Sequence, residues 1–149
     1  MVYGSIGSIS WGTMRNEDLM DSFADELERL AKANDRLSEF SELLLDARQT
    51  DPEDDSASDV VNDLMDALGE FAAPYCYFGA NEGDGSDYGF WPSIDSLEDA
   101  CRYEDVLNVS DLSEIPADYV GEVMLVNDHG NVTFGTAEKG EFVTIWDCV

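Results

Sequence analysis

The sequence predicts an α+β fold, and two observations favour it. Between about residues 13 and 72, apolar side chains recur every three or four positions, as they do on the buried face of a helix. From about residue 74 to residue 149, short runs rich in aromatic and β-branched residues alternate with turns that contain glycine, which is typical of strands. With 149 residues, we expect a single domain in which the helical part packs on an antiparallel sheet.

The first helical stretch is expected to begin at Thr13 as its N-cap, and it contains neither glycine nor proline as far as about Arg48. It is either one long helix or two helices that kink near residues 33–35. If Asn34 and Ser41 are counted in the apolar series, the same spacing fits a coiled-coil seam in which a polar core residue sets the register.

A second helix is expected from about Ala57 to Ala72. Ser56 and Asp59 have the spacing of a capping box, and the helix should stop before Pro74. At 100 degrees per residue, its apolar side chains fill one arc of about 140 degrees, which predicts a single buried face. That face consists of Val60, Val61, Leu64, Met65, Leu68 and Phe71.

The remaining chain has the pattern of strands. The segment Val2 to Ser10 and the runs PYCYFGA and YGFWPS are expected to be extended, with the loop ANEGDG between those two runs and a short helix at about residues 96–103. The last part predicts a three-stranded antiparallel meander, whose turns VNDHGN and TAEKGE place glycine where a positive φ is needed. Its strands are expected at about residues 118–126, 131–135 and 141–147.

The charge is the unusual property of this chain. It has 34 acidic and 7 basic residues, a formal net charge of −27. Because 44% of the residues are hydrophobic, the sequence still predicts a folded protein and not a disordered one. So much negative charge excludes nucleic acid and anionic membranes as direct partners, and it favours the basic nucleic-acid-binding surface of another protein.

Features of targeting and redox chemistry indicate a cytoplasmic protein. The three cysteines are far apart and odd in number, which favours a reducing compartment. The N-terminal sequence lacks the basic and apolar regions of a signal peptide, and no apolar run approaches the roughly 20 residues that span a bilayer. The expected location is therefore the cytoplasm, or the host cytoplasm if a phage encodes the protein.

No catalytic signature is present, so we expect no enzyme, no catalytic residue and no cofactor. His129 is the only histidine, and its neighbours are turn residues rather than a nucleophile or an orienting carboxylate. Carboxylates are abundant, but nothing singles out one pair for a raised pKa. The segment GSIGS lacks the lysine of a phosphate-binding loop.

A calcium loop is the strongest metal alternative. Read from Asp84 to Asp95, the chain matches positions one, three, six and twelve of an EF-hand loop only loosely. The fifth position is Tyr88, the twelfth is Asp instead of Glu, and Pro92 stands where a helix should begin. We therefore expect no specific metal site.

Two acidic features are the candidate partner-binding residues. On the second helix, four acids are spaced four, three and four residues apart, which places them within about 60 degrees of one another, opposite the apolar arc. The acidic loop Glu82, Asp84 and Asp87 is followed by an aromatic pair that could anchor a partner. The candidate set is Asp59, Asp63, Asp66, Glu70, Glu82, Asp84, Asp87, Phe90 and Trp91.

The first helical stretch carries a similar row, which would extend about 42 Å if the helix is continuous. Basic residues lie beside that row, so ordinary pairs such as Glu28 with Lys32 also explain it. Residues 51–100, in contrast, carry fourteen acids and no base. A surface that only keeps a protein soluble normally mixes both signs, so this run favours a binding role.

In charge pattern and size the chain resembles the DNA-mimic proteins that phages and plasmids use against restriction and CRISPR defences. This resemblance includes no motif, but it implies an anti-restriction or anti-CRISPR inhibitor that presents carboxylates in place of phosphates. Two alternatives remain open. Acidity with Asp in excess of Glu and few lysines is also expected in a protein of a salt-adapted organism or its virus. The helical stripe could alternatively form a homodimer in an adaptor module.

Overall fold

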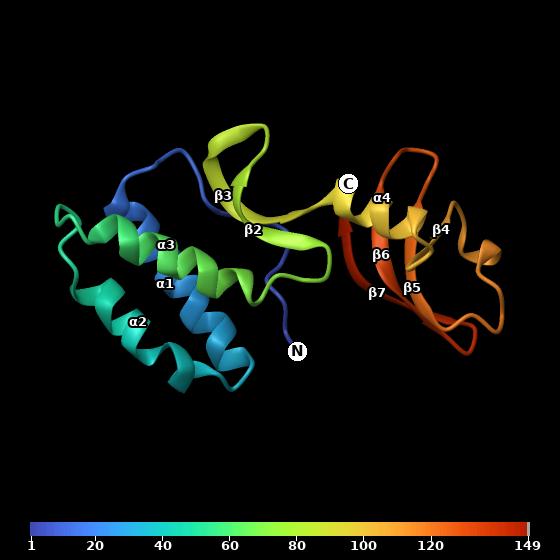
Figure 1. Ribbon diagram of the computed structural model, residues 1–149, viewed down its shortest axis with the longest axis horizontal. Coiled ribbons are helices and arrows are strands. Elements are labelled where there is room, and N and C mark those ends of the chain that lie inside the picture. The colour runs from blue at the N-terminus through green and yellow to red at the C-terminus, as the bar shows by residue number, and fades with distance from the viewer. Residues whose placement is uncertain (149) are drawn as a thin grey trace. The chain divides into compact units, whose positions relative to one another are not determined.

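The computed structural model describes residues 1–148, which group into two compact units (Figure 1). The first unit runs from Met1 to Trp91, and the second begins at Pro92. Four α-helices and two separate sheets are present in the described residues, so the α+β prediction is confirmed. The sequence placed the change from helices to strands near Pro74. The division between units falls later because the first hairpin after Pro74 packs with the helices.

Three helices form a bundle in the first unit: α1 (Asn16–Ala33), α2 (Leu37–Gln49) and α3 (Ala57–Gly69). Each helix packs against the other two. The apolar arc predicted for α3 is confirmed, since all its members are buried except Met65, which is half-buried. Burial of these side chains is the main stabilising contribution to the bundle. The fully buried side chains at its centre are Phe23, Leu27, Leu30, Leu64, Leu68 and Phe71.

The first helical stretch is two helices separated by a tight turn. The backbone N–H of Asn34 donates to Leu30 O, Asp35 has a φ of 56°, and the N–H of Arg36 donates to Ala31 O at 2.8 Å. A residue with positive φ cannot continue a right-handed helix, so the chain reverses here. The Asn34 side chain bonds the backbone oxygens of Val2 and Leu30, so it is not the core residue of a coiled coil.

The expected helix caps are wrong. α1 begins at Asn16, three residues after Thr13, whose hydroxyl accepts from the Arg15 N–H and donates to Asp18. Ser56 does precede α3, but it makes no side-chain capping bond; its hydroxyl donates to Asp54 instead. Ser56 has helical backbone angles, whereas a capping residue is normally extended, so the capping box does not form.

The end of α3 also differs from the expectation. The helix ends at Gly69, before the predicted Ala72, and the next residues form single turns in which the Phe71 N–H donates to Leu68 O. Phe71 remains fully buried. The chain therefore keeps the apolar contact that the sequence predicted, although the regular helix has stopped.

A three-stranded sheet completes the first unit, in the order β1 (Gly7–Ser10), β3 (Asp84–Pro92), β2 (Cys76–Asn81). The prediction of an acidic loop is wrong, because most of that segment belongs to strands. β2 and β3 form a hairpin whose turn is Glu82 and Gly83. Phe78 contacts both Phe90, with ring centroids 5.0 Å apart, and Phe23 of α1 at 5.1 Å. These edge-on aromatic contacts join the hairpin to the helices.

The second unit contains α4 (Ile94–Arg102) and a four-stranded sheet. The predicted antiparallel meander is confirmed as β5 (Gly121–Val126), β6 (Val132–Glu138) and β7 (Glu141–Cys148). A fourth strand, β4 (Val106–Val109), was not predicted, and it pairs with β5 in parallel. Lys139 and Gly140 turn the chain from β6 to β7 with φ values of 53° and 78°, as the sequence of this turn indicated. Within residues 1–148, no helix is long and apolar enough to cross a bilayer.

Candidate acidic binding surface

Three carboxylates form a row along the exposed side of α3, which we call the α3 row: Asp59, Asp63 and Asp66. All three residues are exposed, whereas Val60 and Leu64 on the other side of the helix are buried. The steps of four and three residues correspond to axial rises of about 6 and 4.5 Å. Among the ion pairs of the described residues, none includes a member of the α3 row. The row therefore presents its negative charge to solvent without a counter-charge.

The basic side chains of the first unit are all engaged elsewhere, chiefly by acids of α1 and α2. Most of these pairs are solvent-exposed, so each contributes little to stability. Their effect on the electric field is larger, since every Lys and Arg side chain of this unit lies beside a carboxylate other than those of the α3 row. The pairs are Arg15 with Glu17 and Asp18, Arg29 with Glu26, Lys32 with Glu28, Arg36 with Glu39 and Glu70, and Arg48 with Asp25 and Glu28.

The long acidic row predicted from Asp18 to Asp46 does not exist as one line. The turn at residues 34–36 separates its members onto α1 and α2. Several members also lie in ion pairs, including Asp25 and Glu28 with Arg48, which joins the two helices. The simpler interpretation of this row, as ordinary supporting ion pairs, is the one that the geometry matches.

Glu70, the fourth acid of the predicted row, differs from the other three. It follows the last residue of α3, and its Oε1 lies 2.9 Å from a guanidinium nitrogen of Arg36. Arg36 also bonds Glu39, and its guanidinium lies over the rings of Phe40 and Phe71, 5.3 and 5.1 Å from their centroids. Glu70 is exposed, but its charge is balanced. We therefore leave it out of the α3 row.

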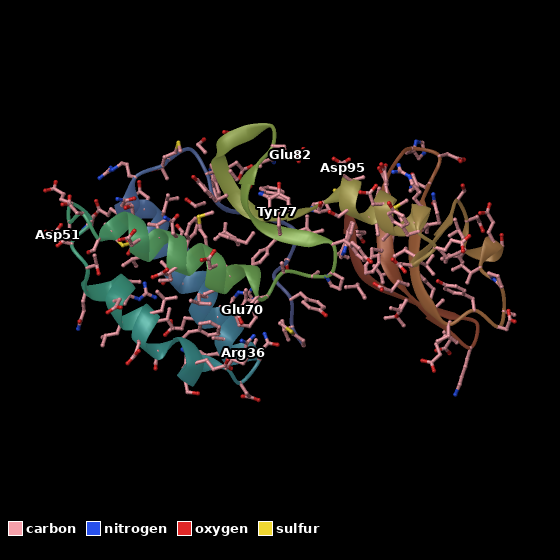
Figure 2. All side chains as sticks on the ribbon, viewed as in Figure 1. Arg36, Asp51, Glu70, Tyr77, Glu82 and Asp95 are labelled. Atoms are coloured by element: carbon pink, nitrogen blue, oxygen red, sulfur yellow. The ribbon has the colours of Figure 1, made fainter. Side chains whose placement is uncertain are left out.

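The linker before α3 supplies acids that the sequence analysis did not select. Four exposed carboxylates lie directly before the helix, and Figure 2 labels the first, Asp51. The Ser56 N–H and hydroxyl donate to Asp54 Oδ1, and these bonds hold the pKa of Asp54 below its ordinary value. Negative charge before a helix N-terminus is also favoured by the helix dipole. The linker acids, which extend the α3 row towards α2, are Asp51, Glu53, Asp54 and Asp55.

The hairpin carries a second acidic group. Glu82 and Asp84 are exposed at the turn, and Asp87 is half-buried in β3. The Ser86 N–H and hydroxyl donate to Asp84 Oδ1 and lower the pKa of this carboxyl group. Burial, and then the charge of Glu82, raise the pKa of Tyr77, which lies on the neighbouring strand. Asp87 Oδ1 is shielded from water and accepts no hydrogen bond from the described residues.

The candidate acids do not form a single cluster. Figure 2 shows Glu70, after the end of α3, and Glu82, at the hairpin turn, in clearly separate places. The α3 row lies on a helix, whereas Asp84 and Asp87 lie on strand β3 of the hairpin. We therefore treat the α3 row with its linker acids, and the hairpin with its acids, as two surfaces of the first unit.

Phe90 is not available as the predicted aromatic anchor, and the role of Trp91 stays a prediction. Phe90 is 0% exposed and belongs to the core, where it packs on Phe78. Trp91 is half-buried, and its indole N–H donates to the backbone oxygen of Gly79 at 2.9 Å. The exposed aromatic of this unit is Trp11, which is 70% exposed and directly follows β1. Sequence reasoning missed Trp11 because its exposure depends on how β1 pairs with a strand about 80 residues away.

The calcium alternative also fails on the fold. An EF-hand needs a loop followed by a helix, but residues 84–92 form strand β3. Within the described residues, no group of three His, Cys, Asp or Glu side chains is placed to hold a metal ion. His129 lies in the β5–β6 turn, where its backbone N–H donates to Asn127 Oδ1.

The acidic charge is distributed evenly between the two units, although the sequence shows a concentration of acids in residues 51–100. Met1–Trp91 carries 21 acids and five bases, and the remainder carries 13 acids and two bases, so the two units are similarly acidic for their lengths. The concentration seen in residues 51–100 thus does not single out one unit. It arises because the bases of the first unit are confined to the segment from Arg15 to Arg48.

No family model, no curated protein and no solved structure matches the chain.

Proposed function

We propose that the chain is an acidic inhibitor of the DNA- or RNA-mimic type, which binds the basic nucleic-acid-binding surface of a target protein. One observation supports this most strongly. The α3 row stays free of counter-charge, although every base of the same unit is paired with other acids. Unpaired like charges at intervals of about 4.5 to 6 Å repel one another and weaken the fold. A binding role accounts for a cost that solubility alone does not require.

The spacing of the row is compatible with a surface that recognises phosphates. Phosphates of one DNA strand advance about 3.4 Å along the helix axis, and their separation through space is longer. Lysines and arginines arranged for such a backbone could contact Asp59, Asp63 and Asp66 in turn. In this proposal the linker acids continue the line, and the activity is binding, not catalysis. A phage- or plasmid-encoded anti-restriction or anti-CRISPR protein would use such binding to block a defence enzyme.

The proposal is tested by capture from a bacterial lysate with the full chain as bait. We expect nucleic-acid-binding proteins to be retained at low salt, to be released as salt rises, and to be displaced by added duplex DNA. The variant with Asp59, Asp63 and Asp66 changed to Lys should lose this capture.

A matched control changes three exposed acids of the second unit, Glu98, Glu104 and Asp118, to Lys. This control has the same net charge as the test variant and should still capture the target. If both variants lose capture equally, binding depends on total charge and the α3 row has no special role. If DNA does not displace the captured protein, the mimic interpretation is wrong.

Salt adaptation is a second candidate, because the two units are similarly acidic for their lengths. A protein adapted to salt acidifies its whole surface and needs salt to screen the repulsion. Its far-UV circular dichroism in dilute buffer should then show little folded structure, with folding restored as salt is added. A sharp unfolding transition in dilute buffer would instead favour the inhibitor.

A further inference from the structure

Trp11 is exposed on a well-anchored part of the backbone. Ser10 pairs with Tyr88 of β3, so Trp11, the next residue, leaves the sheet at the same end as Asp87, which precedes Tyr88. After Trp11, Gly12 turns the chain with a φ of 76°. The Thr13 hydroxyl then bonds Asp18 of α1 at 2.7 Å. The backbone on both sides of the tryptophan is therefore held in place, while its side chain remains 70% exposed.

A second apolar side chain near Trp11 in the sequence is also exposed. Met14, three residues on, is 64% exposed. The nearest base in sequence, Arg15, is already bonded to Glu17 and lies near Asp18. The first unit thus presents an unoccupied aromatic ring at the end of the sheet that carries Asp84 and Asp87, with no free cation within that part of the chain.

We propose that Trp11 and the acids of the β2–β3 hairpin bind an arginine side chain of the target protein, as a second contact separate from the α3 row. A guanidinium is planar and weakly hydrated, so it stacks on an indole face and still donates hydrogen bonds to carboxylates. The exposed carboxylates of Glu82 and Asp84 are the acceptors that such a donor can reach, whereas Asp87 Oδ1 is shielded from solvent.

Charge decides between the possible occupants. Nucleic acid and anionic lipid would be repelled by the hairpin acids. A second copy of the chain carries the same net charge of −27, so its approach would be opposed by repulsion. Lysine would gain from the carboxylates but would stack less well than arginine. The inference depends on the proposed function in one respect, which is that the natural partner has a basic surface.

The test follows the three indole N–H signals of the nitrogen-15-labelled full chain by NMR, with Trp11 assigned from a Trp11→Phe variant. The probe is a short peptide in which arginine alternates with glycine, compared with its lysine equivalent at low salt. We expect the arginine peptide to shift the Trp11 signal saturably and to bind about fivefold more tightly than the lysine peptide. Trp91 and Trp146 should shift little, because the indole N–H of Trp91 is bonded to Gly79 O and Trp146 is buried.

Variants distinguish this contact from non-specific electrostatic attraction between the acidic protein and a basic peptide. Trp11→Ala should reduce binding of the arginine peptide to the level of the lysine peptide, whereas Leu45→Ala, at an exposed leucine of α2, should not. Neutralising the α3 row with Asp59→Asn, Asp63→Asn and Asp66→Asn should leave the Trp11 shift in place. That last variant distinguishes the two proposals: capture of a target can fail while the arginine contact persists.

Three results would overturn the inference. The first is a Trp11 signal that does not move, and the second is equal affinity for the two peptides in the unaltered chain. The third is a dimer, measured by light scattering, that Trp11→Ala dissociates, because the ring would then contact a second copy and not a basic partner.

Discussion

Arg36 and Glu70 are 34 positions apart, yet the guanidinium of one lies 2.9 Å from the carboxylate of the other. Arg36 stands in the turn between α1 and α2, and Glu70 follows α3, so this single contact connects all three helices of the first unit. The same guanidinium covers the rings of Phe40 and Phe71. Its bonds to Glu39 and then Glu70 raise the pKa of Arg36 and keep it charged.

Arg36→Ala should lower the melting temperature of the protein by a few degrees. The substitution removes two carboxylate contacts and the stacking on both rings, and it leaves Glu39 and Glu70 without their cation. Arg29→Ala is the control, because Arg29 bonds only Glu26 of its own helix. Thermal unfolding followed by circular dichroism compares the two variants. Equal losses would mean that the contacts of Arg36 between helices add nothing.

The buried ring of Phe90 and the exposed ring of Trp11 provide a second prediction. Phe90→Ala should destabilise the first unit by about 3–5 kcal/mol, because it empties a fully buried site beside Phe78. Trp11→Ala should change the free energy of unfolding by less than about 0.5 kcal/mol, since its ring is mostly in water. Denaturant unfolding measures both. A large loss from Trp11→Ala would show that the ring packs on the fold and is not available to a partner.

The hairpin acids give a prediction about pH. The Ser86 hydroxyl and N–H lower the pKa of Asp84 in the folded state, so this carboxylate adds stability above the ordinary aspartate pKa of about 4. That contribution should disappear as pH falls through the lowered pKa. In Ser86→Ala only the N–H remains, and the pKa of Asp84 should move back towards its ordinary value.

Carbon-13 NMR of the Asp84 carboxyl group measures this shift directly. Asp111 is an internal reference in the second unit, because Ser113 lowers its pKa in the same way and is unchanged in the variant. The proposal for Ser86 is wrong if Asp84 titrates identically in both proteins.

Two glycines of β3 provide a fourth prediction. A Cβ at Gly89 would clash with the backbone oxygen of Gly7 on β1, whereas a Cβ at Gly85 would have no neighbour within 4 Å. Gly89→Ala should therefore separate β1 from β3 and destabilise the unit by about 1–3 kcal/mol. Gly85→Ala should be tolerated. Denaturant unfolding of both variants tests the register of β1, and equal stability of the two variants would contradict it.

Local patterns in the sequence were sufficient for several elements. The apolar arc around Leu64 predicted the buried face of α3, and the turn at Lys139 and Gly140 predicted the β6–β7 connection. The chain reversal at Asp35 was harder to predict, because no glycine or proline marks it and an aspartate adopts the positive φ. β4 was missed because its four residues are too short to show a clear alternation.

The candidate site depended on contacts between distant segments, which one sequence does not reveal. Helical spacing placed Asp59, Asp63 and Glu70 on one face, but only the fold shows that Arg36 balances Glu70. In the run YGFWPS, neighbouring side chains of a strand point to opposite faces, so Phe90 and Trp91 could not both be exposed. Which one is buried was decided by packing against Phe78 of the neighbouring strand, which in turn contacts Phe23 of α1.

The parallel pairing of β4 with β5 has a consequence for the order of folding. β5, β6 and β7 are sequential neighbours joined by short turns, so their pairing needs only local chain closure. β4 has four residues, and it reaches β5 through a longer connection that contains the short helix Leu112–Glu114. Contacts between nearby residues form sooner than contacts across long loops. From this connectivity we expect the meander to form before β4 joins it.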